Sequence, residues 1–192
     1  MEIETKIFDI KQVRKILRKR EIEPRRVCDV VDFLFDIAHF SPNNWHYNLP
    51  VDKKSWTLSL GDVSVEIPDT EVLMQVRDFC GRWEGKWSKI RLRTVDNIPY
   101  ITIKGPKQTR KWIKSREEIE TRIGSLSLMM RILLDSGAIL QKSIARVREI
   151  YDIPDYKGVE LVVDTFSSAH GDLEYAEIEC SSHTELHTVL KK

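Results

Sequence analysis

The chain contains 192 residues, of which 41% are hydrophobic and 32% are charged, and its formal net charge is +1 at pH 7. This length suits one domain with a buried core, and the balanced charge excludes a global basic field of the kind that binds nucleic acids non-specifically. The three isolated cysteines argue against a disulfide framework or a zinc finger. The sequence contains no apolar run long enough to span a membrane and no signal-peptide pattern, so we expect a soluble, cytoplasmic protein.

The first half of the chain mixes helical and strand patterns. Apolar residues at helical spacing predict a helix with a basic outer face, and mainly apolar residues then predict a strand or buried segment. A loop, a hairpin with Gly61-Asp62 at its turn and a helix capped by Asp69 are expected to follow. In the same order, these five segments cover residues 10–21, 30–40, 41–50, 55–67 and 69–83.

The second half of the chain is dominated by alternating patterns, which indicate strands. The apolar segment 125–136 predicts a helix that ends at Gly137, and 184–192 is expected to form a short helix. The predicted strands cover residues 89–95, 100–105, 111–121, 140–151, 158–166 and 173–180. The sequence therefore predicts one β-rich α+β domain over residues 1–192, with mostly antiparallel connections.

Charged residues recur on one face of these strands. In the opening stretch MEIETK, side-chain alternation places Glu2, Glu4 and Lys6 on the face opposite Ile3 and Thr5. Later strands carry like charges two residues apart, namely Arg91 and Arg93, Glu118 and Glu120, Arg146 and Arg148, and Glu177 and Glu179, and one strand carries Glu160 and Asp164 on either side of Val162. For a single strand, a solvated face explains such a pattern.

The whole set of charged strands favours the wall of a cavity. Like charges on one short stretch repel each other unless an opposite charge lies between them. Arginine and lysine suit phosphate oxygens, whereas clustered carboxylates suit a hard cation such as Mg²⁺ or Mn²⁺. A closed barrel with an ionised lumen would bring these groups together around a metal–triphosphate.

Five motifs carry a resemblance to a known family. EIETK matches the ExExK signature of the CYTH superfamily, the triphosphate tunnel metalloenzymes, and IRLR, TIKGP, REEIE and AEIE follow in the family's order. The motifs reach from residue 2 to residue 179, so the resemblance extends over most of the chain. It implies an eight-stranded antiparallel β-barrel, the triphosphate tunnel, with flanking helices.

The resemblance also implies roles for individual residues. The metal ligands would be Glu2, Glu4, Asp164, Glu177 and Glu179, and the metal Mg²⁺ or Mn²⁺. The substrate-binding set would be Lys6, Arg91, Arg93, Lys104 and Arg116, together with Arg146 and Arg148. Glu118 and Glu120 would form a second acidic pair that serves a second metal or orders the basic residues. Glu4, Lys6 and Arg116 are the candidates for catalysis.

Two features depart from the family pattern. Arg146-Val147-Arg148 stands where the family often has KxR, which keeps the charge but replaces an ammonium with a guanidinium fork. The long segment of about 41–88 has no clear counterpart and resembles an insertion. Its tryptophans are expected to be packing anchors rather than base-stacking platforms, and they are Trp45, Trp56, Trp83 and Trp87.

The sequence leaves three functions open. The leading one is metal-dependent hydrolysis of a triphosphate, with inorganic tripolyphosphate, a nucleoside triphosphate, thiamine triphosphate or an RNA 5′ triphosphate end as substrate. The second is an adenylyl cyclase of class IV type, which converts ATP into cyclic AMP and pyrophosphate. The third is a non-catalytic triphosphate-binding module. The motifs concern the triphosphate and the metal, and they specify neither the organic part of the substrate nor the oligomeric state.

Overall fold

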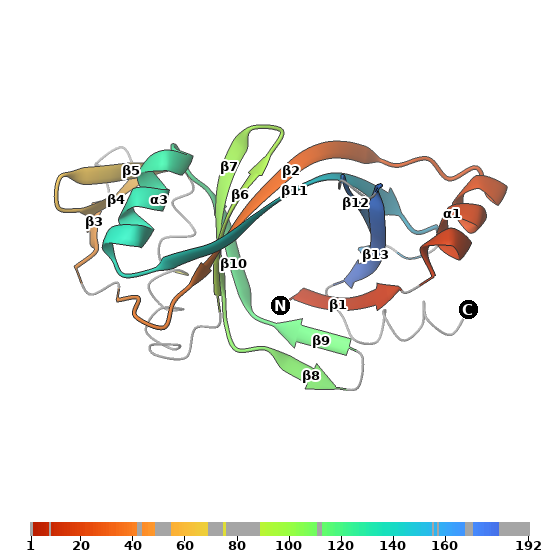
Figure 1. Ribbon diagram of the computed structural model, residues 1–192, viewed down its shortest axis with the longest axis horizontal. Coiled ribbons are helices and arrows are strands. Elements are labelled where there is room, and N and C mark those ends of the chain that lie inside the picture. The colour runs from red at the N-terminus through yellow and green to blue at the C-terminus, as the bar shows by residue number, and fades with distance from the viewer. Residues whose placement is uncertain are drawn as a thin grey trace. The chain divides into compact units, whose positions relative to one another are not determined.

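The computed structural model describes residues 2–7, 9–41, 44–48, 55–68, 75, 89–110, 113–154, 156, 158–167 and 171–180. These residues form antiparallel strands and two helices, in two compact units (Figure 1). Unit 1 comprises Met1–Val30, Lys107–Glu117 and Ala145–Lys192, and unit 2 comprises Val31–Pro106 and Glu118–Ile144. Neither described helix is long and apolar enough to cross a membrane.

Unit 1 is built around an antiparallel ladder. Its elements are β1 (Glu2–Ile7), α1 (Ile10–Lys19), β8 (Gln108–Arg110), β9 (Ile113–Arg116), β12 (Val159–Phe166) and β13 (Leu173–Cys180). Two long strands, β2 (Arg26–Asp36) and β11 (Ile139–Asp152), contribute residues to both units. Within unit 1 the strand order is β11-β12-β13-β1-β9-β8, and every printed pairing in it is antiparallel. This order places β1 between β13 and β9.

The core of unit 1 lies on one face of this ladder. Ile3, Val163 and Ala176 are fully buried there. Helix α1 begins after Asp9, whose side chain accepts a hydrogen bond from the Gln12 backbone N–H at 3.0 Å. The helix buries Leu17 against this core and lies against β13 (Figure 1). Since strand residues alternate between faces, the charged residues of β1 and β13 lie on the opposite face.

Unit 2 has a separate core. Its elements are β3 (His46–Asn48), β4 (Trp56–Leu60), β5 (Val63–Ile67), β6 (Lys89–Val95), β7 (Ile98–Lys104), β10 (Glu118–Arg122) and α3 (Leu126–Asp135). One ladder has the order β10-β7-β6-β2, and β3-β4-β5 form a small sheet against which α3 packs (Figure 1). The β6–β7 hairpin turns at Asp96 and Asn97, which both have positive φ and match a two-residue turn of the primed type.

Most of the predicted elements are present. The hairpin at 55–67, the helix ended by Gly137 and five of the six strands of the second half are confirmed, and so is a β-rich antiparallel arrangement with helices. Residues 46–48 form a short strand within the predicted loop. The described strands form one sheet of ten and one of three rather than a single set of eight. Segment 41–88 adds the sheet of three, the predicted strand 111–121 is divided, and residues 108–110 form an additional short strand. Closure into an eight-stranded barrel stays a prediction.

The remaining predictions concern segment 41–88 and the last residues of the chain. The helices expected at 69–83 and 184–192 lie outside the described residues, as do Trp83 and Trp87. Trp45 and Trp56 are buried in the core of unit 2, and the Trp45 indole N–H donates to Ser136 Oγ at 2.7 Å. Both are therefore packing residues, as the sequence indicates, and the described part of segment 41–88 belongs to this core.

Candidate functional site

The predicted acidic pairs of β1 and β13 meet in one ladder. Glu4 lies directly opposite Glu179, and Lys6 lies directly opposite Glu177. Ile3 and Ile178, which alternate with these residues, are buried in the core on the other face. The ladder therefore collects carboxylates and one ammonium on a single surface of unit 1. Glu2 belongs to the same strand and pairs in register with Arg116 of β9.

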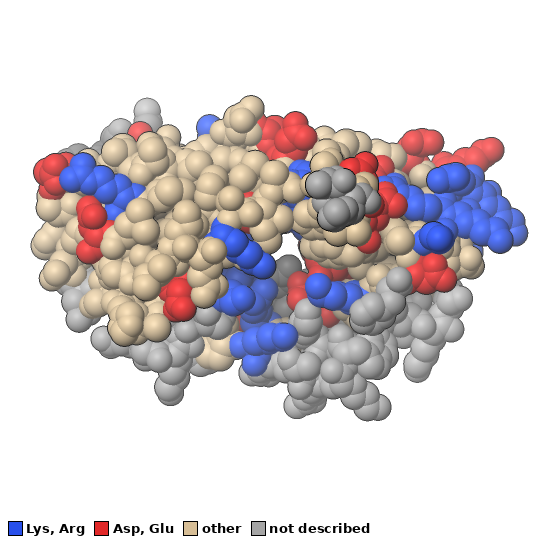
Figure 2. All heavy atoms as spheres, in the orientation of Figure 1, with Lys and Arg blue, Asp and Glu red and all other residues tan. Residues whose placement is uncertain are grey.

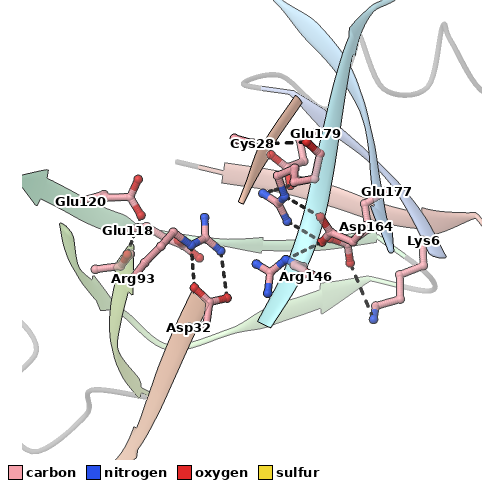
Figure 3. A network of polar contacts seen from close by, with 12 residues as sticks. Lys6, Cys28, Asp32, Arg93, Glu118, Glu120, Arg146, Asp164, Glu177 and Glu179 are labelled. Carbon is pink, nitrogen blue, oxygen red and sulfur yellow. Dashed lines mark hydrogen bonds and ion pairs between the residues drawn. The ribbon is translucent and has the colours of Figure 1, made fainter. Parts of the chain in front are cut away.

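Glu177 is the buried member of this acidic surface (Figure 3). Its Oε1 lies 3.7 Å from Lys6 Nζ. Burial and the nearby charge of Glu4 raise the pKa of Glu177, and the attraction of Lys6 offsets this only in part. The raised pKa means that this carboxyl group holds a proton more readily than an exposed glutamate does.

An aromatic pair lies next to this surface. The rings of Phe166 and Tyr175 stack with centroids 5.4 Å apart. Lys6 Nζ lies 5.0 Å from the centre of the Tyr175 ring, and the guanidinium carbon of Arg146 lies 5.9 Å from that of Phe166. The two rings thus help to position one lysine and one arginine of the predicted substrate-binding set.

Asp164 contacts two arginines in unit 1 (Figure 3). Its Oδ1 and Oδ2 accept hydrogen bonds from Nε and Nη2 of Arg148, both at 2.7 Å, and Arg146 Nε lies 3.0 Å from Oδ2. Asp164 has no exposed surface. Burial lowers the pKa of Arg148, but the hydrogen bonds and charge of Asp164 outweigh it, and the net pKa is raised.

Unit 2 contains three more of the predicted basic residues, and each of the three contacts a carboxylate. Arg93 donates from Nε and Nη2 to the two oxygens of Asp32, at 2.7 and 3.1 Å (Figure 3). Lys104 Nζ lies 2.6 Å from both oxygens of Glu118. Arg91 Nη2 donates to Glu120 at 3.0 Å and to Thr102 Oγ1 at 3.1 Å, and burial together with the charge of Arg93 lowers the pKa of Arg91.

The second acidic pair contacts two of these basic residues, and its strand differs from the prediction. Glu118 pairs with Lys104 and Glu120 with Arg91. The sequence predicts one strand for Arg116, Glu118 and Glu120, but the strand breaks at Glu117. Arg116 ends β9, which pairs with β1, whereas Glu118 begins β10, which pairs with β7. The change of pairing partner gives the physical reason for the break.

Asp32 is a residue that the sequence does not single out. It lies in β2 within the run VVDFLFD, on the same face as Val30. Both residues are buried, and a buried carboxylate requires a cationic partner. A lone acidic residue between apolar strand residues is the signal that could have revealed it. The identity of its partner, Arg93, is not readable from local sequence.

The carboxylates of β1 and β13 suit a hard divalent cation. Glu4, Glu177 and Glu179 offer oxygen ligands on paired strands, and burial together with the charge of Glu4 raises the pKa of Glu177. Within the described residues, no three His, Cys, Asp or Glu side chains already converge into a metal-binding group. Asp164, in contrast, has both oxygens bonded to arginine. The donor chemistry therefore fits Mg²⁺ or Mn²⁺ on the glutamates.

Helix α1 carries a second concentration of charge. Basic side chains cover this helix in Figure 2, and the exposed ones are Lys11, Lys15, Arg18, Lys19 and Arg20. Arg14, which is less exposed, forms ion pairs with Glu149 and Glu174. A pocket of about 600 Å³ lies here, lined in part by these three residues. None of the predicted site residues lines it.

Comparisons with known proteins agree with the motifs. Residues 80–192 match the CYTH domain family. The PH1819 protein from Pyrococcus horikoshii OT3 matches with a TM-score of 0.59 and 19% sequence identity, over 100% of this chain and 85% of its own. HpAC1 from Hippeastrum, a candidate adenylyl cyclase described as having a dominant triphosphatase activity, matches with a TM-score of 0.56 and 13% identity, over 100% and 85%. A candidate adenylate cyclase from Vibrio parahaemolyticus matches with a TM-score of 0.51 and 15% identity, over 98% and 80%. No curated protein matches the sequence.

Proposed function

This chain belongs to the CYTH domain family, and on that premise we propose that it is a divalent-metal-dependent triphosphatase. It hydrolyses a phosphoric anhydride bond of a triphosphate inside the tunnel that the family resemblance predicts. One observation carries the proposal: Glu4 faces Glu179 in the β1–β13 ladder, and Glu177 beside them is buried with a raised pKa. Such an arrangement costs stability unless a cation binds, which is what a site for a metal–triphosphate requires.

The acidic surface would hold the metal. Glu4, Glu177 and Glu179 are the ligands that the described geometry supports, and the ExExK motif adds Glu2. When bound, Mg²⁺ or Mn²⁺ supplies positive charge that neutralises phosphate oxygens. Lys6 would bind a phosphate oxygen, because its ammonium lies beside this acidic surface and is half-exposed.

The basic residues would bind the triphosphate. Arg93, Lys104 and Arg91 are held in place by carboxylates in unit 2, and Arg146 and Arg148 are held in unit 1. Guanidinium and ammonium groups so fixed stabilise charge that develops on phosphate oxygens. Glu4, Lys6 and Arg116 are assigned to the reacting phosphoryl group. The Glu4 carboxylate orients the attacking water, and the side chains of Lys6 and Arg116 bind the phosphate oxygens.

Cyclisation of ATP is the alternative reaction. It requires the ribose 3′-hydroxyl to reach the α-phosphorus, and thus a pocket that folds the nucleoside. The described part of segment 41–88, the one candidate for such a pocket in the sequence, contributes buried residues to the core of unit 2. Hydrolysis needs no nucleoside pocket. The dominant triphosphatase activity ascribed to the Hippeastrum protein is consistent with hydrolysis here as well.

Product identification with a panel of substrates tests the proposal. The chain is incubated with Mg²⁺ or Mn²⁺ and tripolyphosphate, ATP, GTP, thiamine triphosphate or RNA with a 5′ triphosphate. We expect orthophosphate from several of them. Cyclic AMP with pyrophosphate and no orthophosphate would establish the cyclase reaction instead. Tight binding without any product would establish a binding module.

Matched glutamate variants complete the test. Glu4→Gln and Glu179→Gln should lose most of the activity, because each removes one carboxylate ligand. Glu66→Gln is the control, since Glu66 is an exposed residue of β5 in unit 2. Equal activity of all three variants would refute the assignment of the metal site.

A further inference from the structure

Helix α1 presents a row of basic side chains to solvent (Figure 2). Lys11, Lys15 and Lys19 lie four residues apart, so they follow one another along a single face of the helix, with a rise of about 6 Å between successive members. Val13 and Leu17, on the opposite face, pack in the core of unit 1. The row therefore points away from that core. The basic face of α1 is defined by the exposed residues Lys11, Lys15, Arg18, Lys19 and Arg20.

The positive charge of this basic face is not neutralised within the described part of unit 1. Residues 10–20 include six lysines and arginines and no acidic residue. Arg14 forms ion pairs with Glu149 and Glu174 and donates to the Tyr151 hydroxyl at 3.0 Å. Among the residues that the structure describes, no carboxylate forms an ion pair with the five members of the basic face. Arg14 thus fastens the helix to its unit, whereas the basic face keeps its charge.

The stability of the helix explains only part of this charge. The C-terminal end of a helix carries partial negative charge, which favours Arg18 and Lys19 in the last turn. Lys11 lies in the first turn, where the helix dipole disfavours a cation. Lys15 stands four residues from both Lys11 and Lys19, and like charges at this spacing destabilise a helix. A bound polyanion would offset both unfavourable effects.

A phosphate backbone is the polyanion that suits these side chains. We propose that the basic face of α1 is a docking surface for a nucleic-acid strand, which it contacts through phosphodiester oxygens without reading the bases. Lysine and arginine make such contacts, and helix α1 carries no aromatic side chain on which a base could stack. The net charge of the whole chain is +1, so the attraction is local to this face.

Two other kinds of partner fit the basic face less well. A helix that binds a lipid surface buries its apolar side in the bilayer, but the apolar side of α1 packs in the core of unit 1. A protein interface has an apolar or aromatic centre and is depleted in lysine. Three of the five residues of the basic face are lysines, and Ile16 alone among the described residues of α1 is both apolar and exposed. A nucleic acid requires only exposed cations along a surface.

Binding of a strand that has no triphosphate tests the proposal. A fluorescently labelled single-stranded RNA with a 5′-hydroxyl end is titrated with the full chain in excess chelator, and its anisotropy is recorded. Neither a metal nor hydrolysis contributes under these conditions. We expect Kd between about 10⁻⁴ and 10⁻⁶ M, with a steep loss of affinity as salt is added. A lack of saturable binding at low salt would overturn the proposal.

A triple variant locates the binding surface. Lys11→Gln, Lys15→Gln and Lys19→Gln combined should raise Kd by about tenfold or more. The slope of log K against log salt should become shallower by about 2, because each lost contact with a single strand removes about 0.7. Glutamine forms helices about as well as lysine, so we expect the variant to fold, and circular dichroism checks this.

A matched control removes the same charge from other elements. Arg25→Gln, Arg131→Gln and Lys142→Gln combined change three exposed basic residues outside α1. This control should keep Kd within about twofold of the wild type. Equal losses in the two triple variants would mean that net charge alone drives binding, and the proposal would fail.

A single charge reversal covers the case in which the α1 triple variant does not fold. Lys15→Glu places a negative charge at the middle of the basic row, where it forms attractive pairs with Lys11 and Lys19 along the helix. It should therefore fold and still raise Kd for RNA by about tenfold. An unchanged Kd in folded Lys15→Glu would exclude the basic face as the docking surface.

Competition experiments identify the chemistry of the partner. Polyglutamate of the same charge as the RNA, and vesicles that contain anionic lipids, are each offered to the wild type under the same conditions. RNA should bind more tightly than either. Tighter binding of polyglutamate would assign the face to an acidic protein, tighter binding of vesicles would assign it to a membrane, and either result would overturn the proposal. None of these measurements depends on hydrolysis of a triphosphate, so a chain without that activity would refute the proposed function and leave this test intact.

Discussion

Glu4 of β1 lies directly opposite Glu179 of β13, so that two carboxylates share one cross-strand position on the charged face of unit 1. Like charges in this position repel each other. The next pair of the same ladder sets Lys6 against the buried Glu177, and Arg148 Nη1 lies 3.9 Å from Glu179 Oε1. In the proposed function, a divalent cation supplies further positive charge to this face.

Divalent metal should therefore stabilise the protein as well as activate it. Millimolar Mg²⁺ or Mn²⁺ is expected to raise Tm, because a ligand that binds only the folded state stabilises that state. Glu4→Gln should reduce this increase in Tm, whereas the apo form of the variant should be at least as stable as wild type. Differential scanning fluorimetry with and without metal measures both effects. Full turnover in excess chelator would contradict the metal requirement.

Loss of Arg93 should weaken the fold through Asp32. Arg93→Ala leaves the carboxylate of Asp32 buried without this partner, and breaking a buried pair in this way costs about 3–5 kcal/mol. Adding Asp32→Asn should recover a large part of the loss, because the buried charge is then removed. Urea unfolding of the wild type, both single variants and the double variant measures this coupling. Additive losses would mean that the two residues do not depend on each other.

Acid should remove a contribution of Glu149 to stability. Burial raises the pKa of Glu149, but hydrogen bonds from Arg14 and Tyr151 outweigh it, and the net pKa is lowered. A lowered carboxyl pKa gives stability that is present above the unfolded value of 4.5 and is lost as the pH falls through the folded value. Solvent screening limits the contribution to about 1 kcal/mol or less.

The comparison with Glu149→Gln isolates this effect. Wild type should be more stable than the variant at pH 7, and the difference should shrink progressively below about pH 4.5. Unfolding curves across this range measure it. A difference that stays constant down to pH 3 would show that the ion pair with Arg14 does not contribute.

Gly137 should be the less replaceable of two glycines with similar backbone angles. Gly137 has φ +90° and Gly158 has φ +82°, so an alanine is strained at either position. A Cβ at Gly137 would also lie 2.4 Å from the backbone oxygen of His39, whereas a Cβ at Gly158 meets no atom within 4 Å. We expect losses of about 3 kcal/mol or more for Gly137→Ala and about 1–2 kcal/mol for Gly158→Ala. Equal losses by urea unfolding would exclude the steric contribution.

Sequence alternation predicts those strands whose two faces differ most. In β6, Ile90 and Leu92 are fully buried while Arg91 and Lys89 take the other face, and the predicted bounds 89–95 are those of the strand. The same reasoning places Glu177 and Glu179 on the face opposite Ile178. Local alternation determines which face of a strand each side chain takes, and this is enough to predict the buried and charged faces of β6 and β13.

Alternation does not determine which strands pair. Arg116 and Glu118 have the parity of a single strand, and no glycine or proline marks the break at Glu117. Their separation depends on β1 and β7, the partners to which β9 and β10 pair. Asp32 was missed for the same reason, since its role depends on Arg93, which lies 61 residues away. Contacts between distant segments are set by tertiary packing, and one sequence does not display them.

The pairing of β1 with β13 has a consequence for how the chain can vary. Five successive residue pairs, from Ile3 with Cys180 to Ile7 with Ala176, fix the phase of this ladder. Inserting or deleting one residue within β1 would shift that phase, turning Lys6 and Glu4 toward the apolar core and Ile3 away from it. Exchange of one side chain is a local event, but a change of length by one residue reverses the face of every strand residue on one side of the change. Strand length is thus under stricter constraint than residue identity, and natural variation in length is expected in the loops.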